Sequence, residues 1–352
     1  MSSVCAVIGA QFGSEGKGAV VAAIANKYDV HVRTGGPNAG HTIYHEGKPW
    51  VMQSLPCGWI NKNAFLVIGA GATVDAANLA AEIDSVAKAD PTVPRRVFVD
   101  PNASVLLPEH YKTEGGISGD AHLKIGSTGK GVGACRAARM DRGISNLPHA
   151  LAGDYEVLKP YLADTVALLD QWYKEGKSIM LEGTQGSGLS LIHGPWPKCT
   201  SADTNSGQLA TDAGISPNKV TERIIVARTM PIRVAGASGP LYKETDWATI
   251  SARLGKPVEE KTTVTKKIRR IGEWDDALFA RTCILNDPTG VVITFMDYVN
   301  PTDYGKTTYE SLSSGGKAFI LHVAKTHDVK IMAVTTGEKA EHYIDLTETK
   351  LV

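Results

Sequence analysis

Short apolar runs alternate with amphipathic stretches along most of this chain. The runs lie at residues 4–8, 65–68, 97–99, 179–181, 224–226, 291–295 and 331–334. Most are β-branched and lack polar alternation, which is typical of strands buried on both faces. Helical spacing of apolar residues appears between some of them, at residues 76–86, 158–173 and 311–324. This alternation predicts an α/β fold with a mostly parallel central sheet flanked by helices.

The first predicted strand is followed by a glycine-rich turn, GAQFGSEGKG at residues 9–18, and then by an apolar helix. Small residues let backbone N–H groups approach an anion, and the helix N-terminus and Lys17 add positive potential. The turn therefore predicts phosphate binding. Its spacing is not that of the common P-loop, and Gly18 stands where that motif has Ser or Thr. A plain strand-to-helix turn is the alternative.

A second dense motif, GGPNAGHT, lies at residues 35–42. Together the two segments resemble the adenylosuccinate synthetase family, whose loops read roughly G-x-x-x-G-D-E-G-K-G-K and G-G-x-N-A-G-H-T. The resemblance implies a P-loop NTPase-related fold in one domain, residues 1–352, with loop-rich subdomain insertions. The chain is shorter than the usual member, so peripheral elements are expected to be missing. Further matches follow in order at residues 55–58, 125–133, 182–186, 193–194, 200–201, 265–272, 294–297 and 336–337.

Composition narrows the class of protein. The 37 basic and 37 acidic side chains give a formal net charge of zero, which argues against a nucleic-acid or membrane surface. The five cysteines are scattered without a Cys-x-x-Cys pair, which indicates free thiols in a reducing compartment. No signal peptide is evident, and no apolar segment approaches the ~20 residues that span a bilayer. We therefore expect a cytoplasmic protein, in the host cytoplasm if it is viral.

The resemblance implies a two-step ligase reaction. The purine O6 attacks the γ-phosphate of a nucleoside triphosphate, and the amine of L-aspartate then displaces the 6-phosphoryl group. Such chemistry needs alignment and positive stabilisers, which the family supplies with Mg²⁺, backbone N–H groups and the residue matched by Lys17. His41 matches the family's general acid near O6. Gln185 matches the residue that polarises O6, so Lys17, His41 and Gln185 are expected to be catalytic, together with Ser14.

Ser14 is the main departure from the family pattern. It stands where the family carries an aspartate that acts as base and Mg²⁺ ligand. A hydroxyl has no appreciable basicity near neutral pH, so one hypothesis is a catalytically dead nucleotide-binding paralogue. Because Lys17, His41 and Gln185 remain, we favour a changed substrate, with a water or a substrate phosphate as the unassigned base.

The changed substrate is predicted to be a guanine nucleotide. A serine frees volume beside purine C2 and offers a hydroxyl that accepts from a 2-amino group, which guanine has and hypoxanthine lacks. The chain thus resembles the viral 2-aminoadenylosuccinate synthetase branch, which converts dGMP towards 2-aminoadenine. An ordinary adenylosuccinate synthetase acting on IMP with GTP is the alternative. A Rossmann oxidoreductase is disfavoured, because the G-x-G-x-x-G spacing is absent after the first strand.

The donor-base site is altered as well. The family's Thr-Lys-x-Asp has become Thr294-Phe295-Met296-Asp297, and its later Gly-Pro has become Gly337-Glu338. A carboxylate can accept from an adenine amino group, so ATP is the expected donor, with GTP possible. The resemblance assigns Ser14 and Gly40 to the metal. It assigns the donor nucleotide to Gly13, Glu15, Gly16, Lys17, Gly18, Gly40, His41, Thr42, Arg269, Phe295, Asp297, Thr336 and Gly337.

Two further substrate sites follow from the resemblance. One arginine near residues 136–142 is expected to reach the monophosphate across a homodimer interface, and Arg136 is expected on a solvated helix face. A threonine-rich basic run matches the aspartate loop, with Lys267 where the family has an arginine, which weakens a bidentate grip. The purine monophosphate is assigned to Ser14, Asn38, Ala39, Thr128, Arg139, Arg142, Gln185 and Thr200. Aspartate is assigned to Thr263, Val264, Thr265, Lys267 and Arg269.

Overall fold

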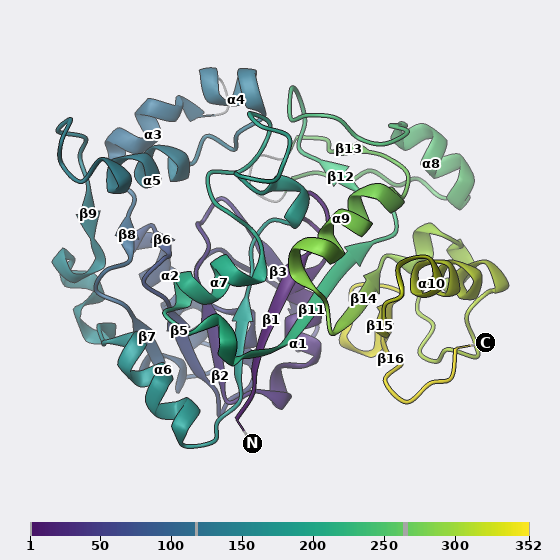
Figure 1. The fold of residues 1–352 in the computed structure, drawn as a ribbon, viewed down its shortest axis with the longest axis horizontal. Coiled ribbons are helices and arrows are strands. Elements are labelled where there is room, and N and C mark those ends of the chain that lie inside the picture. The colour runs from purple at the N-terminus through teal and green to yellow at the C-terminus, as the bar shows by residue number, and fades with distance from the viewer. Residues whose placement is uncertain (1, 117–118, 263–266, 352) are drawn as a thin grey trace.

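A nine-stranded sheet forms the centre of the molecule (Figure 1). The computed structural model describes residues 2–116, 119–262 and 267–351. The strand order is β16-β15-β14-β11-β1-β10-β2-β5-β7, and every neighbouring pair is parallel except β15 and β16. The strands are β1 (Val4–Gly9), β2 (Val30–Arg33), β5 (Phe65–Ile68), β7 (Val97–Val99), β10 (Ile179–Glu182), β11 (Val220–Arg228), β14 (Gly290–Thr294), β15 (Ile331–Thr335) and β16 (Tyr343–Asp345).

Three small sheets and ten α-helices, counted over the described residues, surround this centre. The small sheets pair β3 (His41–His45) with β4 (Lys48–Met52), β12 (Ile232–Arg233) with β13 (Arg270–Ile271), and β8 (Ser104–Val105) with both β6 (Thr73–Val74) and β9 (Ala150–Leu151). The helices are α1 (Lys17–Ala23), α2 (Ala76–Ala87), α3 (Pro108–Glu114), α4 (Asp120–Ile125), α5 (Val132–Asp141), α6 (Thr165–Lys174), α7 (Ser206–Ala213), α8 (Trp247–Leu254), α9 (Asp276–Asn286) and α10 (Ser314–His327). Among the described residues, no helix combines the length and apolar character needed to cross a membrane.

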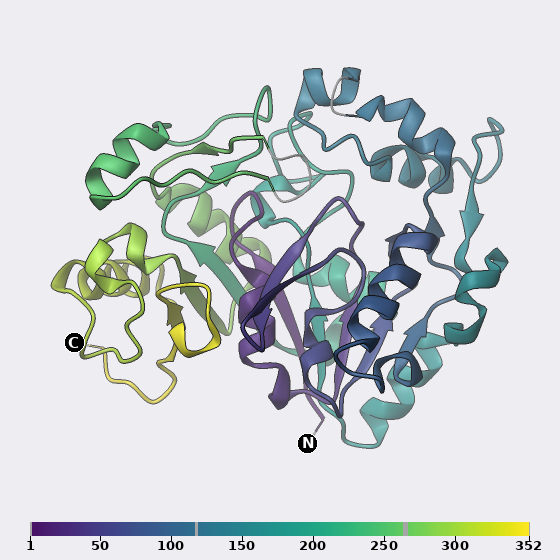
Figure 2. The ribbon, with the colours of Figure 1, turned by 180° about the vertical axis from the view of Figure 1, so that it is seen from behind.

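Each face of the central sheet is covered by its own helices. Cys5 and Val7 of β1 point to one face and pack with α1 and α2, which lie in front in Figure 2. Ala6 and Ile8 point to the other face and pack with α6 and α7. On that same face Ile225 of β11 packs with α9 and α10, as Figure 1 shows. Burial on both faces explains the continuous apolar runs, since side chains alternate along a strand.

The predicted sheet is confirmed, and the differences have local causes. The strand β2 was not predicted, because its apolar residues alternate with His31 and Arg33. Both polar side chains are nevertheless buried and hydrogen-bonded. The helix expected over residues 158–173 is split. Its first part is a 3₁₀ segment, Glu156–Tyr161, that contains Pro160, and α6 starts after Asp164, whose side chain accepts from Ala167 N. Proline interrupts helical hydrogen bonding, and Asp is a favoured N-cap.

Two lobes rise above the carboxyl edge of the sheet. One contains α3, α4 and α5, and the other contains β12, β13 and α8, whose apolar side Trp247, Ile250 and Leu254 packs on Ile271. Both lie at the upper end of the molecule in Figures 1 and 2. The loops after β1, β10 and β14 open towards the space between them. Ligands of open parallel sheets bind at this edge.

Candidate active site

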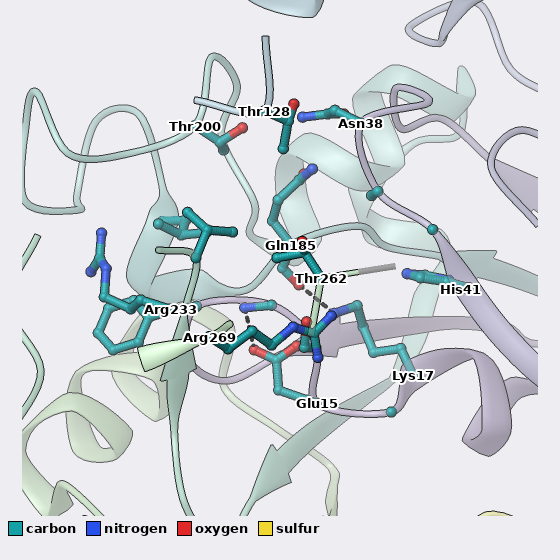
Figure 3. A pocket seen from close by; sticks show the side chains of 18 of the residues that line it. Glu15, Lys17, Asn38, His41, Thr128, Gln185, Thr200, Arg233, Thr262 and Arg269 are labelled. Atoms are coloured by element: carbon teal, nitrogen blue, oxygen red, sulfur yellow. Dashed lines mark hydrogen bonds and ion pairs between the residues drawn. The ribbon is translucent and has the colours of Figure 1, made fainter. Parts of the chain in front are cut away.

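A cavity of about 590 Å³ lies at the carboxyl edge of the central sheet. Its wall combines the loop after β1, the segment before and into β3, and the loop before α5, with contributions from the ends of β10 and β14. Figure 3 shows Thr128, Asn38 and Thr200 at one end of the view, away from Glu15 and Lys17. The glycine-rich turn at residues 9–18 and the GGPNAGHT motif at residues 35–42 therefore share one site.

Glu15 organises the first loop from within. Its carboxylate accepts hydrogen bonds from the backbone N–H groups of Gln11 (3.0 Å) and Gly13 (2.8 Å), and it pairs with Lys17 Nζ at 2.7 Å. Lys17 also donates to the carbonyl of Gln185. Glu15 is fully buried, so its carboxylate stabilises the loop rather than facing the cavity as a free anion. An incoming phosphate would compete with Glu15 for the same donors.

The loop has a backbone that few residues adopt. Ser14 has φ +60° between Gly13 at +85° and Gly16 at +82°, the left-handed region that favours glycine. A side chain at Gly9 would place its Cβ 2.4 Å from the Gln185 carbonyl oxygen, so glycine is required there. Ser14 is exposed to the cavity, and among the described residues its hydroxyl has no hydrogen-bond partner.

His41 is held by a buried carboxylate at the end of β10. Its Nδ1 lies 2.5 Å from Glu182 Oε1, which also accepts from Arg33 Nη1 at 3.0 Å. The other oxygen of Glu182 accepts from Cys57 N at 2.7 Å. Parallel pairing of β10 with β2 puts Glu182 directly beside Arg33 in register. The sheet itself therefore fixes the group that orients the histidine.

Burial governs the charge of this pair. Burial, helped by the Arg33 charge, lowers the pKa of His41 to about 4, although the bond to Glu182 opposes the shift. Burial alone would raise the pKa of Glu182, but Arg33 and His41 outweigh it and hold that pKa at about 2. Near neutral pH a neutral imidazole thus donates Nδ1–H to a carboxylate. His41 can then act as an acid at Nε2 only after taking up a second proton.

A second buried network holds Arg269 at the cavity wall. Glu260 accepts from Arg228 (2.6 Å) and from Arg269 (3.1 Å), and also from the hydroxyl of Tyr298 (2.8 Å). Burial opposes ionisation of Glu260, but the two arginines hold its pKa at about 2. The Arg228 guanidinium carbon lies 4.0 Å from the ring centre of Phe295, which packs the aromatic ring at the end of β14. Arg228 also donates to the carbonyl of Ser14, so this network supports the first loop.

Asp297 and Glu338 bring two carboxylates to the same cavity wall. Burial raises the pKa of Asp297 to about 6, and Lys256 and Arg228 offset only part of that shift. Glu338 accepts from the hydroxyl of Tyr304 at 3.1 Å. Among the described residues, no side chain donates a hydrogen bond to the Asp297 carboxylate, which leaves it available to a ligand.

The opposite end of the cavity is shaped by the turn before α5. The carboxylate of Glu114 accepts from the backbone N–H groups of Gly131 (2.9 Å) and Gly133 (2.8 Å). The same carboxylate also accepts a hydrogen bond from Ser127 Oγ at 3.3 Å, and Ser127 directly precedes Thr128 in the chain. The turn is thus braced by a buried carboxylate, and it presents Thr128 at the cavity, which Asn38 and Thr200 also line.

Most of the expected site residues line this one cavity. Lys267 and Thr336 do not; the Thr336 hydroxyl instead donates to the Lys306 carbonyl at 2.7 Å. Thr263, Val264 and Thr265 fall outside the described residues. The residues brought together are Gly13, Ser14, Glu15, Gly16, Lys17, Gly18, Asn38, Ala39, Gly40, His41, Thr42, Thr128, Gln185, Thr200, Arg269, Phe295, Asp297 and Gly337.

The arginines of α5 lie away from the cavity of their own chain. Arg139 donates to Asn102 O and Ser104 Oγ, and Arg142 ends the helix in a left-handed conformation. The expectation that Arg136 lies on a solvated helix face is wrong. Arg136 is half-buried, its Nε has no partner among the described residues, and Asp212 is the nearby charge that stabilises its ionised form.

Sequence reasoning missed the residues that support the site from behind. Three residues outside the cavity lining hold its side chains in place. Glu182 binds His41, and Glu260, which is paired with Arg228, binds Arg269. Glu182 had a signal, since it opens the motif that contains Gln185. Arg228 and Glu260 had none, because their pairing joins a strand end to a distant segment.

The neutral oxygens of the site suit magnesium better than a transition metal. Ser14 and Gly40 line the cavity and offer a hydroxyl and a carbonyl oxygen, and Mg²⁺ binds hard oxygen ligands and completes its shell with waters and substrate phosphates. The cluster of metal-type side chains found in the described part of the chain is His41, Cys57 and Glu182. That cluster is buried, and Glu182 is already engaged by Arg33, so it fits no magnesium site.

Known proteins match this chain along almost its whole length. The family model for adenylosuccinate synthetase matches residues 6–149 and 144–306. Adenylosuccinate synthetases of Methanococcus aeolicus, Methanococcus maripaludis and Thermococcus sibiricus are 35%, 37% and 36% identical over 345, 345 and 346 residues, which is 97% of this chain and 98% of each relative. Because the match covers 98% of each of these relatives, this chain lacks no large peripheral element that they have.

Two solved structures share the fold. The fully ligated adenylosuccinate synthetase of Plasmodium falciparum superposes with a TM-score of 0.86 at 20% identity, covering 98% of this chain and 100% of that one. The succinoaminodeoxyadenylate synthetase of cyanophage S-2L, solved with dGMP and with dATP as an energy donor, gives a TM-score of 0.80 at 29% identity, covering 98% of this chain and 95% of that one.

Proposed function

Because this chain belongs to the adenylosuccinate synthetase family of carbon–nitrogen ligases in purine nucleotide biosynthesis, we propose that it joins L-aspartate to C6 of dGMP with ATP as the phosphate donor. The product would be 2-amino-deoxyadenylosuccinate. The family and the reaction type are the premise, and the choice of purine and donor is the proposal.

Ser14 is the single observation that carries the choice of purine. Its side chain is exposed to the cavity, and its carbonyl is fixed by Arg228 Nη1 at 3.1 Å. With the backbone held, a serine leaves the space that a family aspartate would fill, and its unpartnered hydroxyl can accept from a 2-amino group. The dGMP bound to the cyanophage structure supports this choice.

The chain's own groups suit the two chemical steps. In the first step, O6 bonds to the γ-phosphorus of ATP and ADP leaves. In the second step, the aspartate nitrogen bonds to C6 and inorganic phosphate leaves. Gln185 would bind O6, and Lys17 would stabilise the transferring phosphoryl group. Mg²⁺, held by Ser14 and Gly40 together with substrate phosphates, would neutralise phosphate charge.

His41 would supply a proton near O6. An anionic phosphoryl group entering the cavity raises the pKa of a neighbouring imidazole, and Glu182 already stabilises positive charge on the ring. His41 would then carry protons on both nitrogens and donate Nε2–H. A substrate phosphate or a water would accept the N1 proton, because the described carboxylates on the cavity wall have other roles. Glu15, Glu114 and Glu338 are engaged by donors, and Asp297 would bind the donor base.

ATP is the proposed donor because the base pocket offers acceptors without a lysine. Phe295 occupies the family's lysine position and packs on Arg228, while Asp297 and Glu338 both line the cavity. A carboxyl group accepts from an adenine amino group. The dATP in the cyanophage structure agrees with an adenine donor.

A homodimer would complete the monophosphate site. Exposed apolar side chains follow Arg139 on the same segment, with Met140 at 78% and Ile144 at 72% exposure. Such side chains favour a protein contact, and Arg139 or Arg142 could then reach the partner's cavity. Light scattering after gel filtration tests the dimer independently of activity.

The decisive experiment is a substrate matrix on wild type, Ser14→Asp and the control Ser14→Ala. Phosphate release would be measured for dGMP, GMP and IMP with ATP or GTP, at fixed aspartate. We expect wild type to prefer dGMP, and Ser14→Asp to move the dGMP-to-IMP ratio of kcat/KM by about tenfold or more towards IMP, the usual size of one lost polar contact or clash. Ser14→Ala should change that ratio less.

Two outcomes would replace the proposal. A wild type that uses IMP with GTP and rejects dGMP would be an ordinary adenylosuccinate synthetase with a displaced base. A folded chain that binds nucleotides but releases no phosphate with any combination would be a catalytically dead paralogue.

A further inference from the structure

His122 joins the two lobes above the cavity. It lies on α4 and is 8% exposed. Its Nδ1 is 2.6 Å from the carbonyl oxygen of Ser127, and its Nε2 is 2.8 Å from Lys267 Nζ. Lys267 follows 145 positions later in the chain and leads into β13, in the opposite lobe.

The two contacts allow only one state of the imidazole. A lysine ammonium has donors and no acceptor, so Nε2 must accept from Lys267. A carbonyl oxygen only accepts, so Nδ1 must carry the proton that Ser127 receives. His122 is therefore neutral, with its proton on Nδ1. A doubly protonated ring, or one protonated on Nε2, would lose the contact with Lys267.

Other contacts bring the same two lobes together. A Cβ on Gly126 would lie 2.6 Å from the Cβ of Ser238, which follows β12. Lys198, in the segment after β10, links the lobes indirectly: its Nζ donates to the carbonyl of Lys124 in α4, and its own carbonyl accepts from Arg233 of β12 at 2.6 Å. Among these contacts, His122 is the one that connects a chargeable side chain to the turn that presents Thr128.

The ammonium group of Lys267 has no acidic partner among the described residues. Among residues 2–116, 119–262 and 267–351, no carboxylate lies within ion-pair distance of its ammonium. One neutral nitrogen acceptor satisfies one of its three N–H donors. A lysine in this state is ready to receive a carboxylate, because the ionic hydrogen bond gained is stronger than the neutral one.

We propose that His122 is a positioning residue whose two contacts, together called the clasp, hold the Lys267 ammonium beside the turn that presents Thr128. Binding of the purine monophosphate at that turn then fixes the position of the ammonium that receives the aspartate substrate. This inference rests on the proposed function and on the family resemblance, which assigns Lys267 to the aspartate substrate although Lys267 stands outside the cavity lining. His122 touches neither substrate; it acts through Ser127 on one side and through Lys267 on the other.

Two variants of His122 separate its two contacts. In His122→Asn the amide nitrogen takes the place of Nδ1 and can still donate to Ser127, but nothing reaches Lys267. In His122→Gln the amide oxygen takes the place of Nε2 and can still accept from Lys267. We expect His122→Asn to raise the aspartate KM about tenfold, the effect of one charge-assisted hydrogen bond, with kcat and the dGMP KM within about twofold. His122→Gln should restore the aspartate KM to within about threefold of wild type.

Equal effects of the two variants on all three constants would overturn the proposal, because a merely structural histidine does not distinguish them. The ¹⁵N shifts of the imidazole give a readout that needs no turnover. We expect an Nδ1–H tautomer in wild type; in Lys267→Met the Nδ1–H should stay and the Nε2 shift should move, because Nε2 loses its donor. An Nε2–H tautomer in wild type, or an Nε2 shift unchanged in Lys267→Met, would refute the clasp. A chain with the expected tautomer that consumes no aspartate would overturn the proposed function, and the substrate coupling with it, while the clasp would stand.

Discussion

Replacing Glu182 with glutamine should damage both stability and catalysis, because one buried carboxylate serves three donors. The side chain is fully buried and holds Arg33, His41 Nδ1 and Cys57 N. Glu182→Gln keeps the shape but removes the charge, and its NH₂ group would face one of those donors. Arg33, itself 1% exposed, would keep its bond to the Ala39 carbonyl but would lose its ionic partner.

The magnitude follows from the loss of a buried counter-charge. Removing one partner of a buried ion pair costs about 3–5 kcal/mol. The pKa of Glu182 is held at about 2 against an ordinary 4.5, so its stabilisation is fully present above about pH 4.5 and disappears as the pH falls towards 2. The difference in unfolding free energy between wild type and Glu182→Gln should therefore be largest near neutral pH and should shrink in acid. Turnover should fall by about two to four orders of magnitude, the reach of a positioned proton donor.

Urea unfolding at several pH values would measure the stability, and phosphate release on the folded fraction would measure turnover. Glu175→Gln is the matched control, because Glu175 is exposed and bonds only Gln171 among the described groups; its free energy should change by less than about 0.5 kcal/mol. A folded Glu182→Gln with wild-type stability and turnover would refute the reasoning. So would a stability loss that stays constant from neutral to acid pH.

Three further predictions follow from the site and its supports. His41→Ala should lower kcat by about two to four orders of magnitude with little loss of fold; near-normal turnover in stopped assays would exclude it as the acid. The pKa of Asp297 is raised by burial to about 6, and a neutral carboxyl matches adenine N1 and N6 while a carboxylate matches guanine N1 and N2. The ATP-to-GTP ratio of kcat/KM should therefore fall as pH rises through about 6, and a flat ratio would remove Asp297 from base recognition. Arg96→Ala should cost about 3–5 kcal/mol in chemical denaturation, because Arg96 holds Asp90 and three carbonyls, yet kcat per folded molecule should stay unchanged.

The sequence by itself determined most of the sheet, the glycine-rich turn after β1 and the edge of the sheet at which the motifs gather. Strands buried on both faces leave uninterrupted apolar runs in the sequence. Such runs predicted β1, β5, β7, β10, β14 and β15. The glycines at positions 9, 13 and 16 indicate a tight turn, because Gly13 and Gly16 have positive φ angles that favour glycine and a Cβ at Gly9 would clash with the Gln185 carbonyl oxygen. The strand alternation also places the motifs at one edge of the sheet.

Only the tertiary structure decided which polar residues are buried together. Arg33 and Glu182 meet because β2 and β10 pair in register, and Arg228 meets Glu260 although no local pattern connects them. The same holds for His122 and Lys267, which come from opposite lobes. Local propensity reports how a segment folds, whereas the charge and proton of a buried side chain depend on whichever distant group the fold brings within about 3 Å.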